Sequence, residues 1–96
     1  MPEAFRTKNG IEYKLPNNYS EFFEGFFEGV KIRNKARNAW ECGDKKNARK
    51  LYKEAAETFA DCGALSVAAE CFRKALMKEA ARDIEEARLE LLRNPD

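Results

Sequence analysis

The fold is decided by residues 32–55, which read IRNKARNAWECGDKKNARKLYKEA. Two runs of apolar and small side chains at helical spacing flank the pair Gly43-Asp44. Glycine favours the left-handed conformation that ends a helix, and an aspartate side chain can cap the next one. The stretch therefore predicts two antiparallel helices joined by a tight turn. The side chains expected to interlock between them are Ile32, Ala36, Ala39 and Trp40 on the first helix and Ala48, Tyr52 and Ala55 on the second.

This pattern resembles the tetratricopeptide repeat, in which small residues let two helices approach and an aromatic residue fills the gap between hairpins. A weaker second copy follows 39 residues later, where Asp83, Ala87 and Leu91 answer Asp44, Ala48 and Tyr52. A half-period echo of the turn and its alanine recurs at Gly63, Ala68 and Phe72. The same residues also resemble the microtubule-interacting and transport domain, a three-helix bundle that binds peptide helices. Both resemblances imply an all-α interaction module of three to four antiparallel helices.

Gly63 ends the second predicted helix, and a third begins near Ala64. No helix-breaking residue follows before Asn94-Pro95. Two alternatives stay open here. The third helix runs on through Leu91, or Asp83 and Glu86 form a capping box that starts a fourth helix.

Residues 1–17 differ from the remainder and form a separate arm, while residues 18–96 form the helical domain. Asn9-Gly10 is a strong signal for a two-residue β-hairpin turn. After it, Ile11, Tyr13 and Leu15 alternate with polar residues, as expected of a half-buried strand. An isolated hairpin is marginally stable in water, so the arm either docks on the helices or stays free.

The stretch after Asn18 repeats the tetrapeptide Phe-Phe-Glu-Gly over residues 22–29. Two glycines in a helix cost about 2 kcal/mol in propensity, and close packing against a neighbour can offset that cost. We favour one long helix here over two helices broken near Gly29. The four phenylalanines form one stripe, which belongs either to the core or to a self-association interface. They are Phe22, Phe23, Phe26 and Phe27.

Composition argues against an enzyme. The chain has no histidine, the usual general base, and no glycine-rich phosphate loop. Three cysteines cannot close a disulfide framework and make a poor zinc set, so we expect free thiols, no metal and no cofactor. No segment is apolar enough to cross a membrane, and the first residues lack a secretory signal pattern. We expect a cytoplasmic protein.

Charge is uneven although the net charge is only +1. Residues 31–53 carry nine basic and two acidic side chains, and both flanks are acidic. Four of the basic residues share one face of the second helix, which is either a solvated surface or, less favoured, a nucleic-acid or anionic-membrane contact. They are Lys46, Arg49, Lys50 and Lys53.

Family resemblance also implies a peptide groove along the first helix of each hairpin. By that resemblance Arg33 and Arg37 occupy groove positions beside Asn34, and Arg73 does so in the second copy. Arginine binds carboxylates bidentately, which favours an acidic partner. The function expected is therefore a non-enzymatic module that binds a protein or peptide in a helical groove. The alternatives are a self-associating structural subunit, such as a homodimer through the phenylalanine stripe, and a small nucleic-acid-binding protein.

Overall fold

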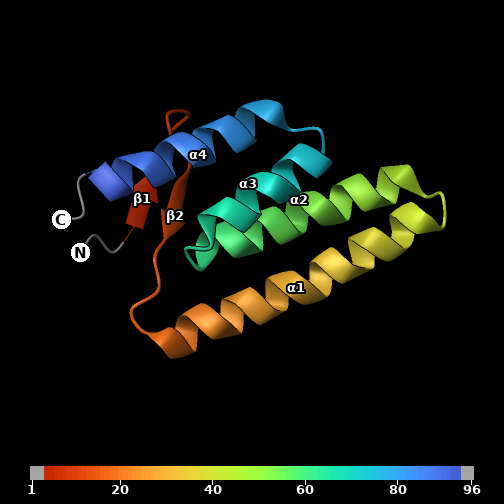
Figure 1. Ribbon diagram of the computed structural model, residues 1–96, viewed down its shortest axis with the longest axis horizontal. Coiled ribbons are helices and arrows are strands. Elements are labelled where there is room, and N and C mark those ends of the chain that lie inside the picture. The colour runs from red at the N-terminus through yellow and green to blue at the C-terminus, as the bar shows by residue number, and fades with distance from the viewer. Residues whose placement is uncertain (1–3, 94–96) are drawn as a thin grey trace.

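The computed structural model describes residues 4–93, and these fold into a short β-hairpin followed by four helices, each antiparallel to the one before it (Figure 1). The all-α class with an N-terminal hairpin arm is confirmed. The outermost residues of the arm and of the helical domain, including the stop at Asn94-Pro95, lie outside the described residues. The elements are β1 (Ala4–Arg6), β2 (Glu12–Lys14), α1 (Tyr19–Glu41), α2 (Lys45–Asp61), α3 (Leu65–Lys74) and α4 (Lys78–Arg93).

The first helical hairpin consists of α1 and α2, and the residues predicted to begin and end these helices do so. The Asn18 side chain accepts a hydrogen bond from the Glu21 amide at 2.9 Å, and the Glu21 carboxylate accepts one from the Asn17 amide at 2.9 Å. Gly43 takes a φ of 84°, and the Asp44 side chain caps α2 by accepting from the Asn47 amide at 3.2 Å. The favoured single long helix is confirmed, since α1 continues unbroken past Gly29.

Gly25 and Gly29, which we call the glycine strip, make the closest contact between α1 and the α2 segment, and only the edge of the phenylalanine stripe, at Phe26, joins it. A Cβ placed on Gly25 would lie 2.5 Å from the Cβ of Cys62, and one placed on Gly29 would lie 2.7 Å from the Phe59 ring. This close approach explains two glycines inside a helix, because any side chain would push α1 away from α2. Ile32 and Ala36 continue the same buried contact toward the turn.

The phenylalanines are consequently not a buried core stripe. Phe23 and Phe27 are 49% and 59% exposed. Phe22 and Phe26 are half-buried, and the Phe26 ring lies 5.5 Å from the Phe59 ring. The periodicity correctly marked an apolar face, but helix α2 packs beside that face.

Residues 64–93 form two helices, so a single helix through Leu91 is wrong, and the fourth helix of the second alternative exists but does not begin at Asp83. Helix α3 ends at Lys74, Leu76 adopts a left-handed φ of 61°, and α4 begins at Lys78. Asp83 therefore lies inside α4 and starts no helix, so the copy 39 residues after the first does not describe the second hairpin. The structural counterpart of Gly43 in that hairpin is Leu76.

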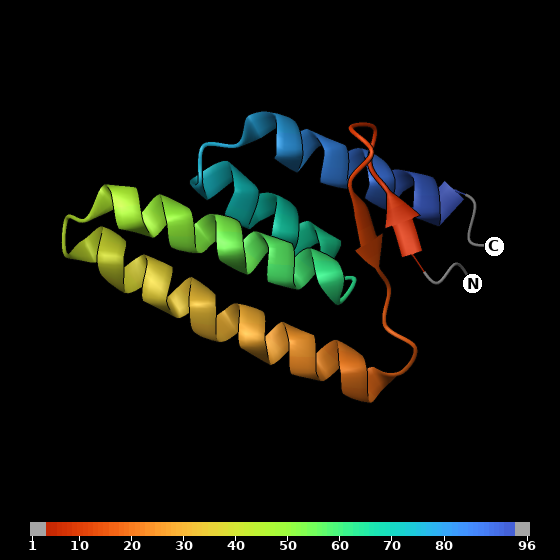
Figure 2. The ribbon, with the colours of Figure 1, turned by 180° about the vertical axis from the view of Figure 1, so that it is seen from behind.

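The half-period echo, in contrast, has a clear physical basis. Ala48, Ala68 and Ala81 each lie in the first turn of α2, α3 or α4, and each donates its amide to the carbonyl of the residue four positions earlier at 3.0 Å. All three are buried, at 0%, 0% and 2% exposure. A small residue at this position lets the start of each helix approach its neighbour, which produces the stacked hairpins seen from behind in Figure 2.

The N-terminal arm docks on the helices. Phe5 of β1 pairs with Tyr13 of β2, their rings stack at 5.3 Å, and both are buried in the common core. Lys8 forms a 2.9 Å ion pair with Glu86 of α4, and Asn9 donates a hydrogen bond to Asp83. Ile11 was expected to face inward with Tyr13. It is instead 49% exposed, because it belongs to the turn and β2 begins only at Glu12.

Candidate functional site

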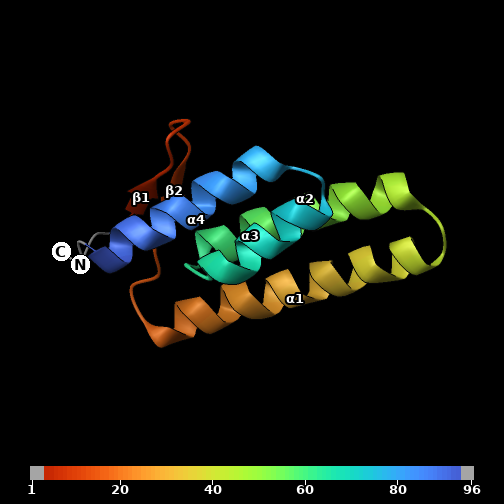
Figure 3. The same cartoon turned by 45° about the horizontal axis from the view of Figure 1, so that its top comes forward.

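One face of the molecule is formed by α1 and α3, with α3 in front of α2 and between α1 and α4 (Figure 3). Along α1, five large side chains fall on this face at helical spacing. From the N-terminal end they are Phe22, Phe26, Arg33, Arg37 and Trp40. The face therefore changes from aromatic at one end to basic at the other.

At the basic end, α1, α2 and α3 enclose a cleft of about 530 Å³, which we call the basic cleft. Three cations line it against one carboxylate, and aromatic and aliphatic side chains complete it. Its residues are Arg37, Trp40, Glu41, Tyr52, Arg73, Lys74 and Leu76. A cationic rim around apolar surface is suited to a ligand with both acidic and apolar groups.

The cations of the basic cleft differ in how far they are already engaged. Arg73 lies 3.5 Å from Glu85 of α4, and the Lys74 ammonium lies 5.5 Å from the Tyr52 ring centre and 3.8 Å from Glu70. Arg37 is exposed and has no ion pair with any residue between 4 and 93. Arg37 is therefore the cation most available to a ligand.

Arg33 lies one helical turn along α1 from Arg37 and is half-buried. Its guanidinium carbon is 5.9 Å from the centre of the Phe59 ring. Its Nε is buried and finds no hydrogen-bond acceptor within the described part of the chain. A buried donor without a partner is costly, so an acceptor brought by a ligand would be favourable here.

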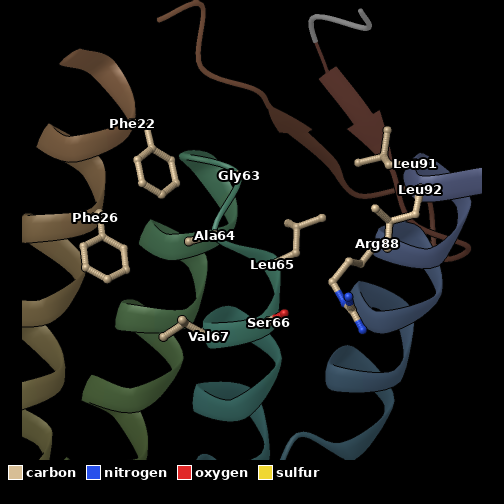
Figure 4. A pocket seen from close by; sticks show the side chains of 10 residues that line it. All are labelled: Phe22, Phe26, Gly63, Ala64, Leu65, Ser66, Val67, Arg88, Leu91 and Leu92. Carbon is tan, nitrogen blue, oxygen red and sulfur yellow. The ribbon is translucent and has the colours of Figure 1, made fainter. Parts of the chain in front are cut away.

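At the opposite end of the face lies an apolar hollow of about 440 Å³ between α1, the start of α3 and the last turns of α4 (Figure 4). Phe22 and Phe26 face it from one side, Val67 lies on its floor, and Leu91 and Leu92 border the other side. Leu92 is 68% exposed, so this side of the rim is apolar and open to solvent, and Arg88 is the one charged side chain among the lining residues.

Three of the four residues predicted for the groove share this face. Arg37 and Arg73 line one cleft, and Arg33 lies beside it on α1. Asn34 is exposed and is not a lining residue of the basic cleft, because it lies about 100° around the helix from Arg33.

Trp40 was expected to pack inward, and this is wrong. It lies at the margin of the buried α1 stripe, is 44% exposed, and carries the Lys45 ammonium 5.2 Å from its ring centre. Sequence reasoning also missed Tyr52, Lys74 and Leu76 as cleft residues. The sequence pattern marked neither Lys74 nor Leu76 as a groove residue.

The basic face of α2 is a separate surface. Lys46, Arg49, Lys50 and Lys53 are all exposed, on the side of α2 away from its buried residues. None of the four makes an ion pair with another residue of the 4–93 segment. The structure brings these four together as predicted and keeps them apart from the basic cleft.

The thiols and acidic groups define no reactive or metal-binding centre in the described residues. Burial raises the pKa of the Cys71 thiol to about 11, and burial also raises the pKa of Cys62. Cys42 is exposed, and all three thiols are free. Across residues 4–93 there is no group of three or more metal-ligating side chains, and none of the described helices has the length and apolarity to span a bilayer.

Comparison of the chain with protein-family models, with curated proteins and with solved structures returned no match.

Proposed function

We propose that this protein is a non-enzymatic interaction module that binds an acidic, partly apolar peptide segment along the face formed by α1 and α3. The observation that carries the proposal is the convergence of Arg37, Arg73 and Lys74 around the exposed ring of Trp40 in one cleft. Aromatic and arginine side chains are the residue types enriched at binding hot spots.

Electrostatics favours an acidic ligand. The cleft has three cations against the single carboxylate of Glu41. Arg37 has no ion pair with residues 4–93, and the Arg33 Nε has no acceptor there. A ligand carboxylate can accept bidentate hydrogen bonds from such guanidinium groups, and these are among the stronger hydrogen bonds in proteins.

The apolar hollow supplies a second anchor for the same ligand. Phe26 and Arg37 are separated by about 16 Å along the α1 axis at 1.5 Å per residue. An extended chain covers that distance with about five residues. The ligand therefore carries a large apolar side chain for the hollow and a carboxylate about five positions away for the basic cleft.

Isothermal titration calorimetry with a designed probe tests this proposal. The probe is a short peptide with one leucine and a cluster of glutamates five positions away, and the reference is the same peptide with glutamines. Arg37→Glu should weaken binding of the glutamate peptide by at least about tenfold, because it places a carboxylate where the ligand carboxylate binds. The matched control is Arg49→Glu, the same charge change on the basic face of α2.

The control should bind within about twofold of wild type at moderate salt, because its charge is screened over roughly a Debye length from the cleft. Equal loss of affinity in both variants would indicate a nonspecific charge effect and contradict the proposed site. Unchanged affinity in Arg37→Glu would contradict it as well. Far-UV circular dichroism of each variant checks that helicity is retained.

A further inference from the structure

Helix α1 has a face that the rest of the described chain leaves largely uncovered. It packs on α2 through Gly29, Ile32 and Ala36, while Phe23 and Phe27 on another side are 49% and 59% exposed. These two rings stack on each other at 6.1 Å. Two exposed, stacked phenylalanines form an apolar patch that a partner surface would be expected to cover.

The patch continues along α1 with the spacing of a coiled-coil seam, through Val30, which is half-buried at the margin of the core, to the exposed Asn34. Phe23, Phe27, Val30 and Asn34 follow one another at intervals of four, three and four residues. This spacing is that of the a and d positions of a heptad, which meet a second helix in knobs-into-holes packing. We call these four residues the outer stripe.

Charged residues along one edge of the outer stripe indicate which helix fits it. Glu24 and Glu28 come first, and Lys31 and Lys35 follow, all exposed and on the same side of the stripe at about 100° per residue. None of the four makes an ion pair with any residue from 4 to 93. The edge is therefore acidic toward the N-terminus of α1 and basic toward its C-terminus.

We infer that the outer stripe binds a second copy of this chain, with the two α1 helices antiparallel about a two-fold axis near Gly29. In antiparallel helix pairs, residues on one edge meet the same edge of the other helix. Glu24 and Glu28 then face Lys35 and Lys31 of the second copy, and symmetry repeats both pairs. In a parallel arrangement this charged edge would instead face the other edge of the second helix, which carries Phe22, Phe26 and Gly29, so the carboxylates would stay unpaired.

The dimensions of α1 suit this interface. Its 23 residues give a length of about 34 Å, so two antiparallel helices can share several layers of contacts. The order of charges makes α1 complementary to its own reversed copy, and this self-complementarity selects a second copy of the chain over an unrelated helix. The interface uses the outer stripe and not the basic cleft, so it is independent of the peptide-binding proposal.

Sedimentation equilibrium of the full chain over a wide concentration range tests the dimer first. Wild type should show a reversible monomer–dimer equilibrium, and Phe23→Ser with Phe27→Ser should be monomeric with helicity unchanged. Leu89→Ser is the matched control, because Leu89 of α4 is also 49% exposed but lies outside the outer stripe. A wild-type protein that remains monomeric at the highest concentration overturns the inference, as does a Leu89→Ser variant that loses the dimer equally.

Charge reversal then tests the antiparallel arrangement. Glu24→Lys with Glu28→Lys, and separately Lys31→Glu with Lys35→Glu, should each weaken self-association by at least about tenfold, because each places like charges across the interface. An equimolar mixture of the two variants should recover a mixed dimer near wild-type affinity. Failure of the mixture to recover association overturns the antiparallel pairing, since general destabilisation would not be reversed by mixing.

Discussion

Replacing Gly29 by alanine sets two effects of opposite sign against each other. In a helix interior, alanine is favoured over glycine by about 1 kcal/mol, so an open site would be stabilised by the change. At Gly29, however, an added Cβ would lie 2.7 Å from Cδ1 and Cε1 of Phe59 and 2.9 Å from its Cζ. Ordinary carbon–carbon contacts lie near 3.5–4.0 Å, so one ring would be overlapped at three atoms.

The overlap should outweigh the gain in propensity. Phe59 is 0% exposed and is surrounded by other core side chains, so its ring has little room to move. Overpacking a well-packed core costs about 1–3 kcal/mol, and we place this overlap at the upper end. After subtraction of the propensity gain, Gly29→Ala should destabilise the protein by about 2 kcal/mol, which lowers the Tm of a domain this size by roughly 10 °C.

Urea unfolding followed by circular dichroism measures this loss. The reference for propensity alone is the difference between Lys53→Ala and Lys53→Gly, because Lys53 is exposed in the interior of α2, and alanine should be favoured there by about 1 kcal/mol. The penalty at Gly29 should shrink in a Phe59→Leu background, which a double-mutant cycle detects. A Gly29→Ala protein as stable as wild type would refute the close packing of α1 on α2.

Three further predictions concern individual residues. Leu76→Gly should raise the stability by about 1 kcal/mol in thermal unfolding, because Leu76 is 60% exposed and holds a φ of 61° that glycine adopts without strain; a lower Tm would contradict this. The native pKa of Cys71, about 11, exceeds its ordinary value of 9.0, so its thiol contributes stability below pH 9 that is lost as the pH rises toward 11. In urea unfolding, Cys71→Ala should therefore lose less stability over that range than wild type, and parallel curves would show that the thiol does not matter. A thiol reagent should modify Cys42 quickly in the native protein and Cys62 only after denaturation, and equal rates would contradict the burial of Cys62.

Local backbone chemistry made much of the fold predictable. The turns at Gly43 and Gly63 both take positive φ values near 85°. The hairpin of the arm forms as predicted, but its turn is centred on Lys8 and Asn9, closed by the Gly10 amide donating to the Thr7 carbonyl at 2.9 Å, and is not a two-residue Asn9-Gly10 turn. The small residue at Ala48 and its echo at Ala68 correctly marked the starts of two close-packed helices. These signals are strong because they are local. A glycine meets the backbone conformation of its own turn, and a small residue meets the close packing at its own helix start.

Tertiary packing decided what the sequence could not. Leu76 takes a left-handed conformation that its residue type disfavours, so no local signal could locate the turn between α3 and α4. The phenylalanine stripe and the glycine strip are both visible in the sequence, but only the packing of α2 shows that Gly29 is covered and Phe27 is not. The basic cleft was predicted in part, because periodicity places Arg37 on a face of α1 but does not show what faces it from α3.

Trp40 allows the most direct measurement of ligand binding, because it is the only tryptophan in the chain and it lines the basic cleft. Its emission should change saturably when the peptide with leucine and glutamates is titrated into the wild-type protein. The change should be strongly weakened in Arg37→Glu and absent with the glutamine peptide. An emission that stays constant across the titration, or that responds equally to the glutamine peptide, would contradict an acidic-peptide site between α1 and α3.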